Sequence, residues 1–259
     1  MDSQIKKRMF QSDQIYEYKS LKFTRDNFKN LYKSEQHIFK KYLKNCKTVL
    51  DIGCLYGSLG KALKKFNIDY SGMDSDLNAI KFGKNIYKDI KLFNDDFTKP
   101  KKKYGKYDFV FSLNVFEHYT NWKKIIKSYK NFSKKYFCFT SNLKLEGNAS
   151  LDFETSFFYY NGDKKPMLWA LHNMFELISY LSSIEINAKK IYVYAYNKYN
   201  KKNFHTAAHS AMPIDPRKLL IGIFVVELND KKQNRSTIFY KRPNVEIIIN
   251  DKNYFKTNW

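Results

Sequence analysis

The stretch that decides the fold runs from Val49 to Gly60 and reads VLDIGCLYGSLG. Its first four residues, apolar except for Asp51, are typical of a short buried strand, and a helical pattern follows the stretch. Glycine at Gly53 and Gly57 lets the backbone turn tightly and approach a ligand that a Cβ atom would hold away. Ligands of open α/β sheets bind at such a junction, at the carboxyl end of a strand. The stretch therefore predicts a cofactor site between a first strand and its helix.

Strand-like apolar runs alternate with amphipathic stretches along the rest of the chain. This alternation predicts parallel strands joined by crossover helices. The expected strands are Thr48–Ile52, Tyr70–Met73, Ile90–Phe93, Phe109–Leu113, Tyr136–Thr140, Lys190–Tyr196 and Leu219–Leu228, with Val245–Ile249 as an extra edge strand. The expected helices are Leu59–Phe66, Leu77–Ile86, Trp122–Phe132 and Met174–Leu181. The predicted fold class is α/β, with a doubly wound, seven-stranded and mostly parallel sheet.

Two nucleotide-binding motifs fit the glycine stretch poorly. The dinucleotide fingerprint G-x-G-x-x-G needs glycines two and five positions after Gly53, and those positions hold Leu55 and Ser58. A phosphate-binding P-loop needs Gly-Lys-Ser or Gly-Lys-Thr, which does not follow here. Nicotinamide and flavin dinucleotides are therefore disfavoured as cofactors.

The stretch from Val49 to Gly57 resembles the first motif of the class I S-adenosylmethionine (SAM)-dependent methyltransferases, V-L-D-x-G-C-G-x-G. Matching residues are Asp51, Gly53, Cys54 and Gly57, whereas Leu55 stands where the family has its middle glycine. The resemblance implies a Rossmann-like methyltransferase fold with SAM as cofactor. It also implies that this loop, Leu55 included, passes the methionine part of SAM.

Further matches follow in the family's order. Asp74 ends the second expected strand, 74 − 53 = 21 positions after Gly53, where the family's acidic residue binds both ribose hydroxyls. After the third expected strand, the resemblance implies an acid for the adenine amino group and an apolar neighbour for the ring. Asp96 with Phe97 fits these roles best, with Asp95 close behind.

The segment from Asp108 to His118 is similar to the family's fourth strand and its exit, D-x-V-x-x-x-x-V-L-E-H. The resemblance implies that Asn114 is a cofactor-binding residue. Glu117 and His118 are the catalytic candidates, because histidine has a pKa suited to taking a proton from the acceptor. The alternative is that Glu117 and His118 anchor the cofactor loop or cap the next helix.

Several of these residues have simpler structural interpretations. Asp96 is also suited to be a helix N-cap, as is Asp76. Asp108 precedes a strand and is expected to be structural, and Cys54 is expected to pack as a small apolar residue with an unreactive thiol.

One domain is expected for 259 residues. Residues 1–45 are predicted to form an N-terminal helical cap, since Phe23–Leu43 has helical spacing and no glycine or proline. Residues 46–144 form the predicted SAM-binding half. Residues 145–175, rich in aromatic side chains, are a candidate insertion or lid, and residues 176–259 complete the sheet and end in a tail.

Two motifs of nucleic-acid base methyltransferases are missing from the sequence. No N/D-P-P-Y/W motif follows the fourth strand, which argues against methylation of the exocyclic amino groups of bases. No cysteine stands where a pyrimidine C5 methyltransferase has its nucleophile. We therefore expect methylation of an oxygen or nitrogen atom of a small molecule. Aromatic residues of the candidate lid are expected to line its pocket or to pack the lid: Phe153, Phe157, Phe158, Tyr159, Tyr160 and Trp169. Weaker candidate bases on the acceptor side are His172, His205 and His209.

Two other functions stay open. An RNA methyltransferase is consistent with the formal net charge of +22, although the excess lysines are scattered along the chain. A non-catalytic SAM-binding or interaction protein is consistent with Leu55 and with the weak evidence for a base.

The remaining features concern the protein's surroundings. The isolated cysteines Cys46, Cys54 and Cys138 predict reduced thiols and no metal site. The sequence has no apolar run long enough to span a bilayer and a charged start instead of a secretory signal, so a cytoplasmic protein is expected. Its oligomeric state is not predicted.

Overall fold

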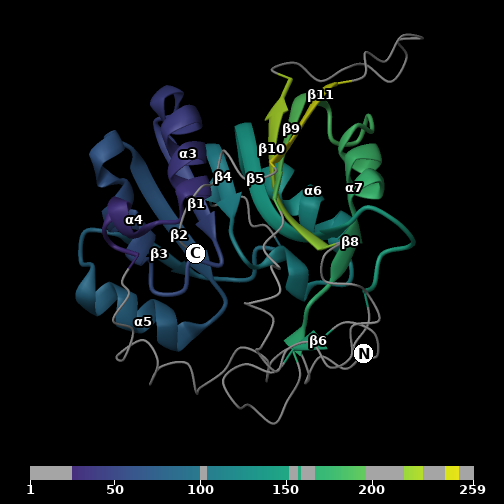
Figure 1. The fold of residues 1–259 in the computed structure, drawn as a ribbon. Coiled ribbons are helices and arrows are strands. Elements are labelled where there is room, and N and C mark those ends of the chain that lie inside the picture. The colour runs from purple at the N-terminus through teal and green to yellow at the C-terminus, as the bar shows by residue number, and fades with distance from the viewer. Residues whose placement is uncertain are drawn as a thin grey trace. The chain divides into compact units, whose positions relative to one another are not determined.

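The structure is a computed structural model, and it describes residues 25–99, 104–151, 157–158, 167–196, 219–229 and 243–250. The chain divides into two compact units, each with strands and helices (Figure 1). The first unit holds the described residues up to Ser112 together with residues 131–133. The second holds the other described residues from Leu113 onward.

The first unit is built on parallel strands in the order β4-β1-β2-β3. They are β1 (Thr48–Ile52), β2 (Asp69–Asp74), β3 (Lys91–Asn94) and β4 (Tyr107–Ser112). The register pairs Asp51 of β1 with Gly72 of β2 and with Phe111 of β4. Every residue of β4 is buried, as its lack of polar alternation predicts for a strand covered on both faces.

The helices of the first unit lie before β1, between β1 and β2, and between β2 and β3, and the last two groups have the expected βαβ order. They are η1 (Phe28–Asn30), α3 (Lys33–Tyr42), η2 (Leu43–Asn45), α4 (Ser58–Leu63), η3 (Lys64–Phe66) and α5 (Leu77–Ile86). At the start of α5, the Asp76 carboxylate accepts hydrogen bonds from the backbone N–H groups of Asn78 (2.8 Å) and Ala79 (3.1 Å), which confirms it as the N-cap. A Cβ atom at Gly83 would lie 2.2 Å from the Tyr56 carbonyl oxygen, so α5 packs this closely only with glycine there.

Asp108 joins the starts of β1 and β4. Its carboxylate accepts hydrogen bonds from the backbone N–H groups of Lys47 (2.8 Å) and Thr48 (3.2 Å), and its own N–H donates to the Thr48 hydroxyl (3.0 Å). This confirms that Asp108 has a structural role.

The second unit has strands in the order β11-β9-β10-β5, with β8 also paired to β5. They are β5 (Ser133–Lys144), β8 (Leu171–Asn173), β9 (Ala188–Tyr196), β10 (Leu219–Leu228) and β11 (Asn244–Asn250). β10 runs antiparallel to both β5 and β9, whereas β8 and β11 are parallel to their partners. A separate ladder joins β6 (Phe157–Phe158) to β7 (Met167–Leu168).

The helices of the second unit are η5 (Phe116–His118), α6 (Trp122–Phe132) and α7 (Met174–Leu181). Its core is aromatic. The Phe139 ring lies 4.6 Å from the Phe116 ring and 5.0 Å from the Phe224 ring, between centroids. Burial of such large rings stabilises this unit.

The predicted α/β class is confirmed, and several predicted elements match to the residue, among them α5, α6, α7 and β10. The strand count differs. Among the described residues the first unit contributes four strands and the second five to their sheets, where seven and an extra edge strand were predicted. The unexpected additions are β8 and the full length of β5, which extends to Lys144.

The stretch expected to form one helix or a helix pair over Phe23–Leu43 is interrupted. Leu31 and Tyr32 have extended backbones, with ψ of 152° and 146°. The Glu35 carboxylate accepts a hydrogen bond from the Tyr32 N–H (3.2 Å). This bond is part of a capping box, and α3 therefore starts as a separate helix at Lys33. Local capping therefore outweighs the continuous apolar spacing.

Some predictions lie outside the described residues. These are residues 1–24 of the predicted cap, residues 152–156 and 159–166 of the candidate lid, and His205 and His209. A helix with the long apolar run needed to span a bilayer is absent from the described residues. Cys46, Cys54 and Cys138 are buried free thiols. The described part of the chain also contains no cluster of three or more side chains that could hold a metal ion.

Candidate functional site

The loop after β1 has an unusual backbone. Gly53 (φ 77°) and Gly57 (φ 79°) are both left-handed, the conformation in which glycine carries no steric penalty. Hydrogen bonds from the N–H groups of Gly53 (2.8 Å) and Cys54 (3.3 Å) to the Met73 carbonyl hold the loop against the end of β2. The two motif glycines are thus required by this loop's shape.

Leu55 also has a left-handed backbone, with φ of 52°. This conformation costs a residue with a Cβ atom about 1 kcal/mol or more. Its side chain is 40% exposed, so no core packing compensates for the strain. The position therefore keeps the backbone shape of the family's glycine while carrying a branched side chain.

Asp74 at the end of β2 holds the Leu55 backbone. Its Oδ2 accepts a hydrogen bond from the Leu55 N–H (2.8 Å), and its Oδ1 accepts one from the Asp76 N–H (2.9 Å). Burial raises the pKa of Asp74, and the two backbone donors oppose that rise. Each carboxylate oxygen has a second lone pair, so the group can still accept hydrogen bonds from a ligand.

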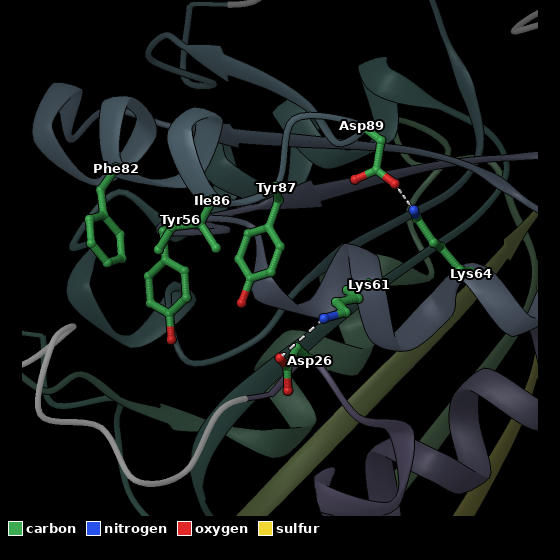
Figure 2. Close-up of a pocket in the computed structure, with 8 residues that line it drawn as sticks. All are labelled: Asp26, Tyr56, Lys61, Lys64, Phe82, Ile86, Tyr87 and Asp89. Carbon is green, nitrogen blue, oxygen red and sulfur yellow. Dashed lines mark ion pairs between the residues drawn. The ribbon is translucent and has the colours of Figure 1, made fainter.

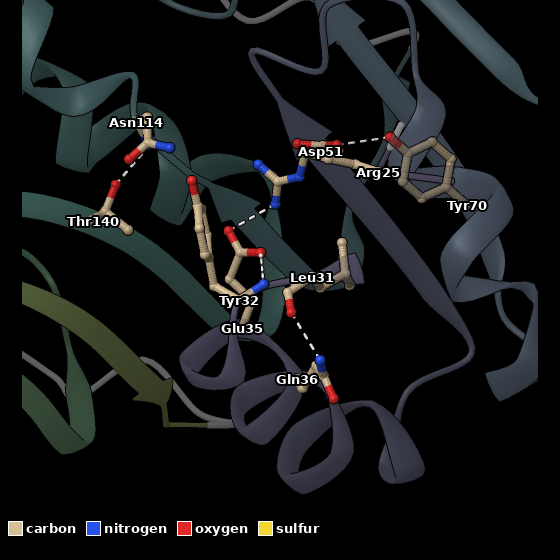
Figure 3. A network of polar contacts seen from close by, with 9 residues as sticks. All are labelled: Arg25, Leu31, Tyr32, Glu35, Gln36, Asp51, Tyr70, Asn114 and Thr140. Carbon is tan, nitrogen blue, oxygen red and sulfur yellow. Dashed lines mark hydrogen bonds and ion pairs between the residues drawn. The ribbon is translucent and has the colours of Figure 1, made fainter. Parts of the chain in front are cut away.

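Asp51 lies behind the loop, in a buried polar network that the sequence did not reveal (Figure 3). The Tyr70 hydroxyl donates a hydrogen bond to Asp51 Oδ2 (2.7 Å), and the Arg25 guanidinium pairs with the Glu35 carboxylate (2.7 Å). Burial raises the pKa of Asp51 to about 7, although the Tyr70 hydrogen bond and the Arg25 charge oppose the rise. Neighbouring Asp74 and Glu35 carboxylates add to it.

Cys54 is packed rather than exposed. A Cβ atom on Gly72 would lie 2.6 Å from its sulfur, so β2 approaches closely here. Burial raises the pKa of the thiol well above its usual value, and nearby Asp51 and Asp74 raise it further. A thiol that stays protonated is a poor nucleophile, in agreement with the interpretation of Cys54 as a packing residue.

The two acids after β3 have different partners. Asp95 accepts hydrogen bonds from the Tyr104 hydroxyl and from the Asp96 N–H (2.9 Å). Asp96 accepts from the N–H (2.9 Å) and the hydroxyl (2.7 Å) of Thr98. No helix begins at Asp96, so its carboxylate stabilises a turn instead of the helix N-terminus that was the alternative. Phe97 is buried.

The second unit carries the residues from the exit of β4. Asn114 is exposed and left-handed, with φ of 56°, and its N–H donates to the Thr140 hydroxyl (2.6 Å; Figure 3). Asparagine is one of the few residues besides glycine that tolerate this conformation. Glu117 is buried, and its carbonyl accepts a hydrogen bond from the Ala170 N–H (2.7 Å). These bonds fix η5 against the segment before β8.

His118 has a defined hydrogen-bonding direction. Its Nδ1 lies 2.8 Å from the carbonyl oxygen of Leu168. A carbonyl oxygen can only accept a hydrogen bond, so Nδ1 carries the proton in the neutral ring. In that neutral tautomer the basic lone pair is on Nε2, and a lone pair is what a general base uses to take a proton.

His172 proves different from its prediction. It was expected in or after a loop, but it lies on β8 and is only 1% exposed. Its Nδ1 is 3.0 Å from the Ser141 hydroxyl, and its ring packs 4.5 Å from that of Phe116. Burial lowers the pKa of His172 to about 3, so the side chain stays neutral within the core. We assign it a packing role.

Comparison with known proteins agrees with this geometry. A family model described as a methyltransferase domain matches residues 23–186. No curated protein matches the chain. Among solved structures, an O-methyltransferase from a trans-AT PKS multienzyme of Brevibacillus brevis, in complex with S-adenosyl-L-homocysteine, has 14% identity and a TM-score of 0.55, over 83% of this chain and 78% of that one.

Two further solved structures share the fold. A putative SAM-dependent methyltransferase from Listeria monocytogenes has 14% identity and a TM-score of 0.53, over 75% of this chain and 98% of that one. The N-terminal domain of EvdMO1, crystallised in the presence of SAH and D-fucose, has 12% identity and a TM-score of 0.52, over 76% and 82%. At identities this low, the similarity to these structures shows the fold alone. The family match spans most of the chain and shows the family. The protein therefore belongs to the class I methyltransferase family, whose cofactor is SAM.

Proposed function

We propose that this methyltransferase acts on an oxygen or nitrogen atom of a small-molecule acceptor, with His118 as the general base. When bound, SAM supplies a methyl group on a good sulfonium leaving group. The protein's own residues then have to align the acceptor and, for a hydroxyl, remove its proton. The observation that carries the proposal is the hydrogen bond from His118 Nδ1 to the Leu168 carbonyl, because in the neutral ring it assigns the proton to Nδ1 and the basic lone pair to Nε2.

The residues of the first unit fit SAM. The left-handed loop from Gly53 to Gly57 turns its backbone without a clash at either glycine, and Asp74 keeps lone pairs for the two ribose hydroxyls. We assign Asp74 to the ribose, and Asp96 or Asp95 to the adenine amino group. Both acids are half-buried, so a donor from a ligand can reach them.

We further assign Asn114 and Glu117 to supporting roles on the second unit. The left-handed Asn114 sets the direction in which the chain leaves β4, and the Glu117 backbone ties η5 to Ala170. Both features stabilise the conformation of the segment that carries His118. Glu117 is therefore proposed as a positioning residue.

A small-molecule acceptor has support from two neighbours of the same fold. One is an O-methyltransferase from a trans-AT PKS multienzyme, and the other was crystallised in the presence of a sugar, D-fucose. Oxygen acceptors such as hydroxyls need a base far more than amines do, which agrees with a histidine as the proposed base.

The test measures S-adenosylhomocysteine release from SAM with a panel of hydroxylated and amino metabolites, and with RNA at two salt concentrations. We expect turnover with a small molecule. His118→Gln should lower kcat by about 10²–10⁴-fold, the usual contribution of a general base, and leave SAM affinity unchanged. His37→Gln, on α3 of the first unit, is the matched control.

Three outcomes would oppose the proposal. Turnover with RNA alone, together with steeply salt-dependent RNA binding, would favour an RNA methyltransferase. SAM binding without turnover on any acceptor would favour a non-catalytic protein. Full activity of His118→Gln would remove the histidine from the mechanism.

A further inference from the structure

A pocket of about 400 Å³ lies on the first unit, between α4 and α5 (Figure 2). None of the residues proposed to hold SAM lines it. The pocket touches the cofactor loop only through Tyr56, whose carbonyl oxygen packs against Gly83 of α5. It is therefore a candidate second binding site.

One wall of this pocket is aromatic. The Tyr56 and Tyr87 rings are nearly parallel, with centroids 6.3 Å apart and an interplanar angle of 11°. Phe82 meets Tyr56 edge-on at 5.7 Å. Tyr56 and Tyr87 are only 6% and 7% exposed, whereas Phe82 is half-buried and Ile86 is 53% exposed. Phe82 and Ile86 therefore offer a ligand an apolar surface that solvent can reach, and the two buried tyrosines pack behind it.

The other wall is polar and balanced in charge. Lys61 faces Asp26 with its Nζ 3.8 Å from the carboxylate, and Lys64 is ion-paired with Asp89 (Figure 2). A separation of 3.8 Å is too long for a hydrogen bond, so the Lys61 ammonium can still donate to a ligand.

The Tyr87 hydroxyl can donate a hydrogen bond at neutral pH. Burial raises the pKa of Tyr87 to about 12, and the negative charge of Asp26 contributes. At neutral pH the hydroxyl is therefore protonated, and it can donate as well as accept.

We propose that this pocket binds a neutral, polyhydroxylated ring, such as a pyranose sugar. A sugar has an apolar C–H face that packs on the aromatic wall, and hydroxyls that both donate and accept. Such hydroxyls can accept a hydrogen bond from the Lys61 ammonium and donate one to the Asp26 carboxylate. A charged ligand would add an unpaired charge beside the two ion pairs, which is unfavourable. An apolar ligand would remove water from the ion pairs without forming hydrogen bonds to them.

The test uses the full chain with saturating S-adenosylhomocysteine and a panel of methyl pyranosides of glucose, galactose, mannose, fucose and N-acetylglucosamine. NMR titration or calorimetry should detect binding of at least one, with a Kd on the order of 1 mM. Phe82→Ala and Lys61→Met should each weaken that binding at least about fivefold, roughly 1 kcal/mol.

Matched controls separate the pocket from general effects. Lys65→Met removes a lysine four residues further on, whose Nζ lies over the Phe28 ring and not in the pocket. Phe175→Ala removes an exposed aromatic ring from the second unit. Both should bind the sugar as the wild type does. If Phe82→Ala unfolds, the exposed Lys61→Met still provides the test.

Two results would overturn the inference. One is that no pyranoside binds. The other is binding that Phe82→Ala and Lys61→Met leave unchanged, which would put the sugar elsewhere on the protein. Neither result bears on methyl transfer or on His118, so the proposed function is tested independently.

Discussion

Replacing Asp74 with alanine should weaken SAM binding and also lower stability. The carboxylate is proposed to accept from two ribose hydroxyls, each charge-assisted hydrogen bond contributing about 1.5–3 kcal/mol. Losing even one corresponds to at least about tenfold in Kd. The same carboxylate accepts the backbone N–H groups of Leu55 (2.8 Å) and Asp76 (2.9 Å). Both donors lose that partner in the variant.

The stability cost follows from those two backbone bonds. Each contributes about 0.5–1.5 kcal/mol net, and water can partly replace them at this exposed loop. Removing a carboxylate whose pKa is raised by burial offsets part of the loss. A net cost of about 1–2 kcal/mol should lower the melting temperature by about 2–8 °C in a protein of this size.

Calorimetry with SAM and thermal melting without ligand measure the two effects separately. Asp76→Ala is the matched control, since Asp76 caps α5 through Asn78 and Ala79 and is not proposed to touch SAM. It should cost about 1 kcal/mol of stability and leave the Kd unchanged. Wild-type SAM affinity in Asp74→Ala would refute the ribose assignment. An unchanged melting temperature would refute the inference that the Asp74 carboxylate stabilises the loop.

Three further predictions concern the same unit. Leu55→Gly should have a melting temperature near that of the wild type, because relief of about 1 kcal/mol of left-handed strain offsets the similar entropic cost of glycine. Calorimetry should show that the variant binds SAM more tightly. Weaker SAM binding by a folded variant would contradict this prediction. Asp51→Asn should stabilise the protein above about pH 7 but hardly near pH 4, as thermal melts across this pH range would show. The reason is that burial raises the pKa of Asp51 in the folded protein, so folding favours the protonated carboxyl group. The stability that this carboxyl group contributes is present below its unfolded pKa and is lost as the pH rises through about 7, whereas asparagine does not titrate. Thermal shift should show stabilisation by SAM and none by NAD, because the loop lacks the dinucleotide glycine spacing; the reverse pattern would contradict the cofactor assignment.

Much of the fold was predictable because its signals are local. The helix from Leu77 to Ile86 begins at an aspartate N-cap and keeps its apolar spacing to the end, and the sequence predicts both bounds correctly. The strand at Leu171–Asn173 was not predicted, because three residues carry no usable periodicity and the strand exists only by pairing with β5. Such pairing is a tertiary effect that outweighs local propensity.

The candidate site was predictable in its positions but not in its contacts. Sequence spacing identified Asp51, Gly53 and Asp74 as a group at the ends of two strands. It could not identify Tyr70 as the partner of Asp51, because that contact depends on the register that pairs Val49 with Tyr70 across β1 and β2. Arg25 and Glu35 come from the cap region, far from the motif in sequence, and only the folded chain brings them near Asp51.

Leu55 and Asp74 are best understood as one unit. A branched residue occupies a left-handed conformation at Leu55 only because surrounding contacts hold it, and the hydrogen bond from its N–H to Asp74 Oδ2 is one of them. The carboxylate proposed to bind the ribose thus also fixes the loop proposed to pass the methionine part of SAM. Changes at residues that share a hydrogen bond do not add. Because glycine at position 55 needs no such hold, removing the Asp74 carboxylate should cost less stability in a Leu55→Gly background than in the wild type.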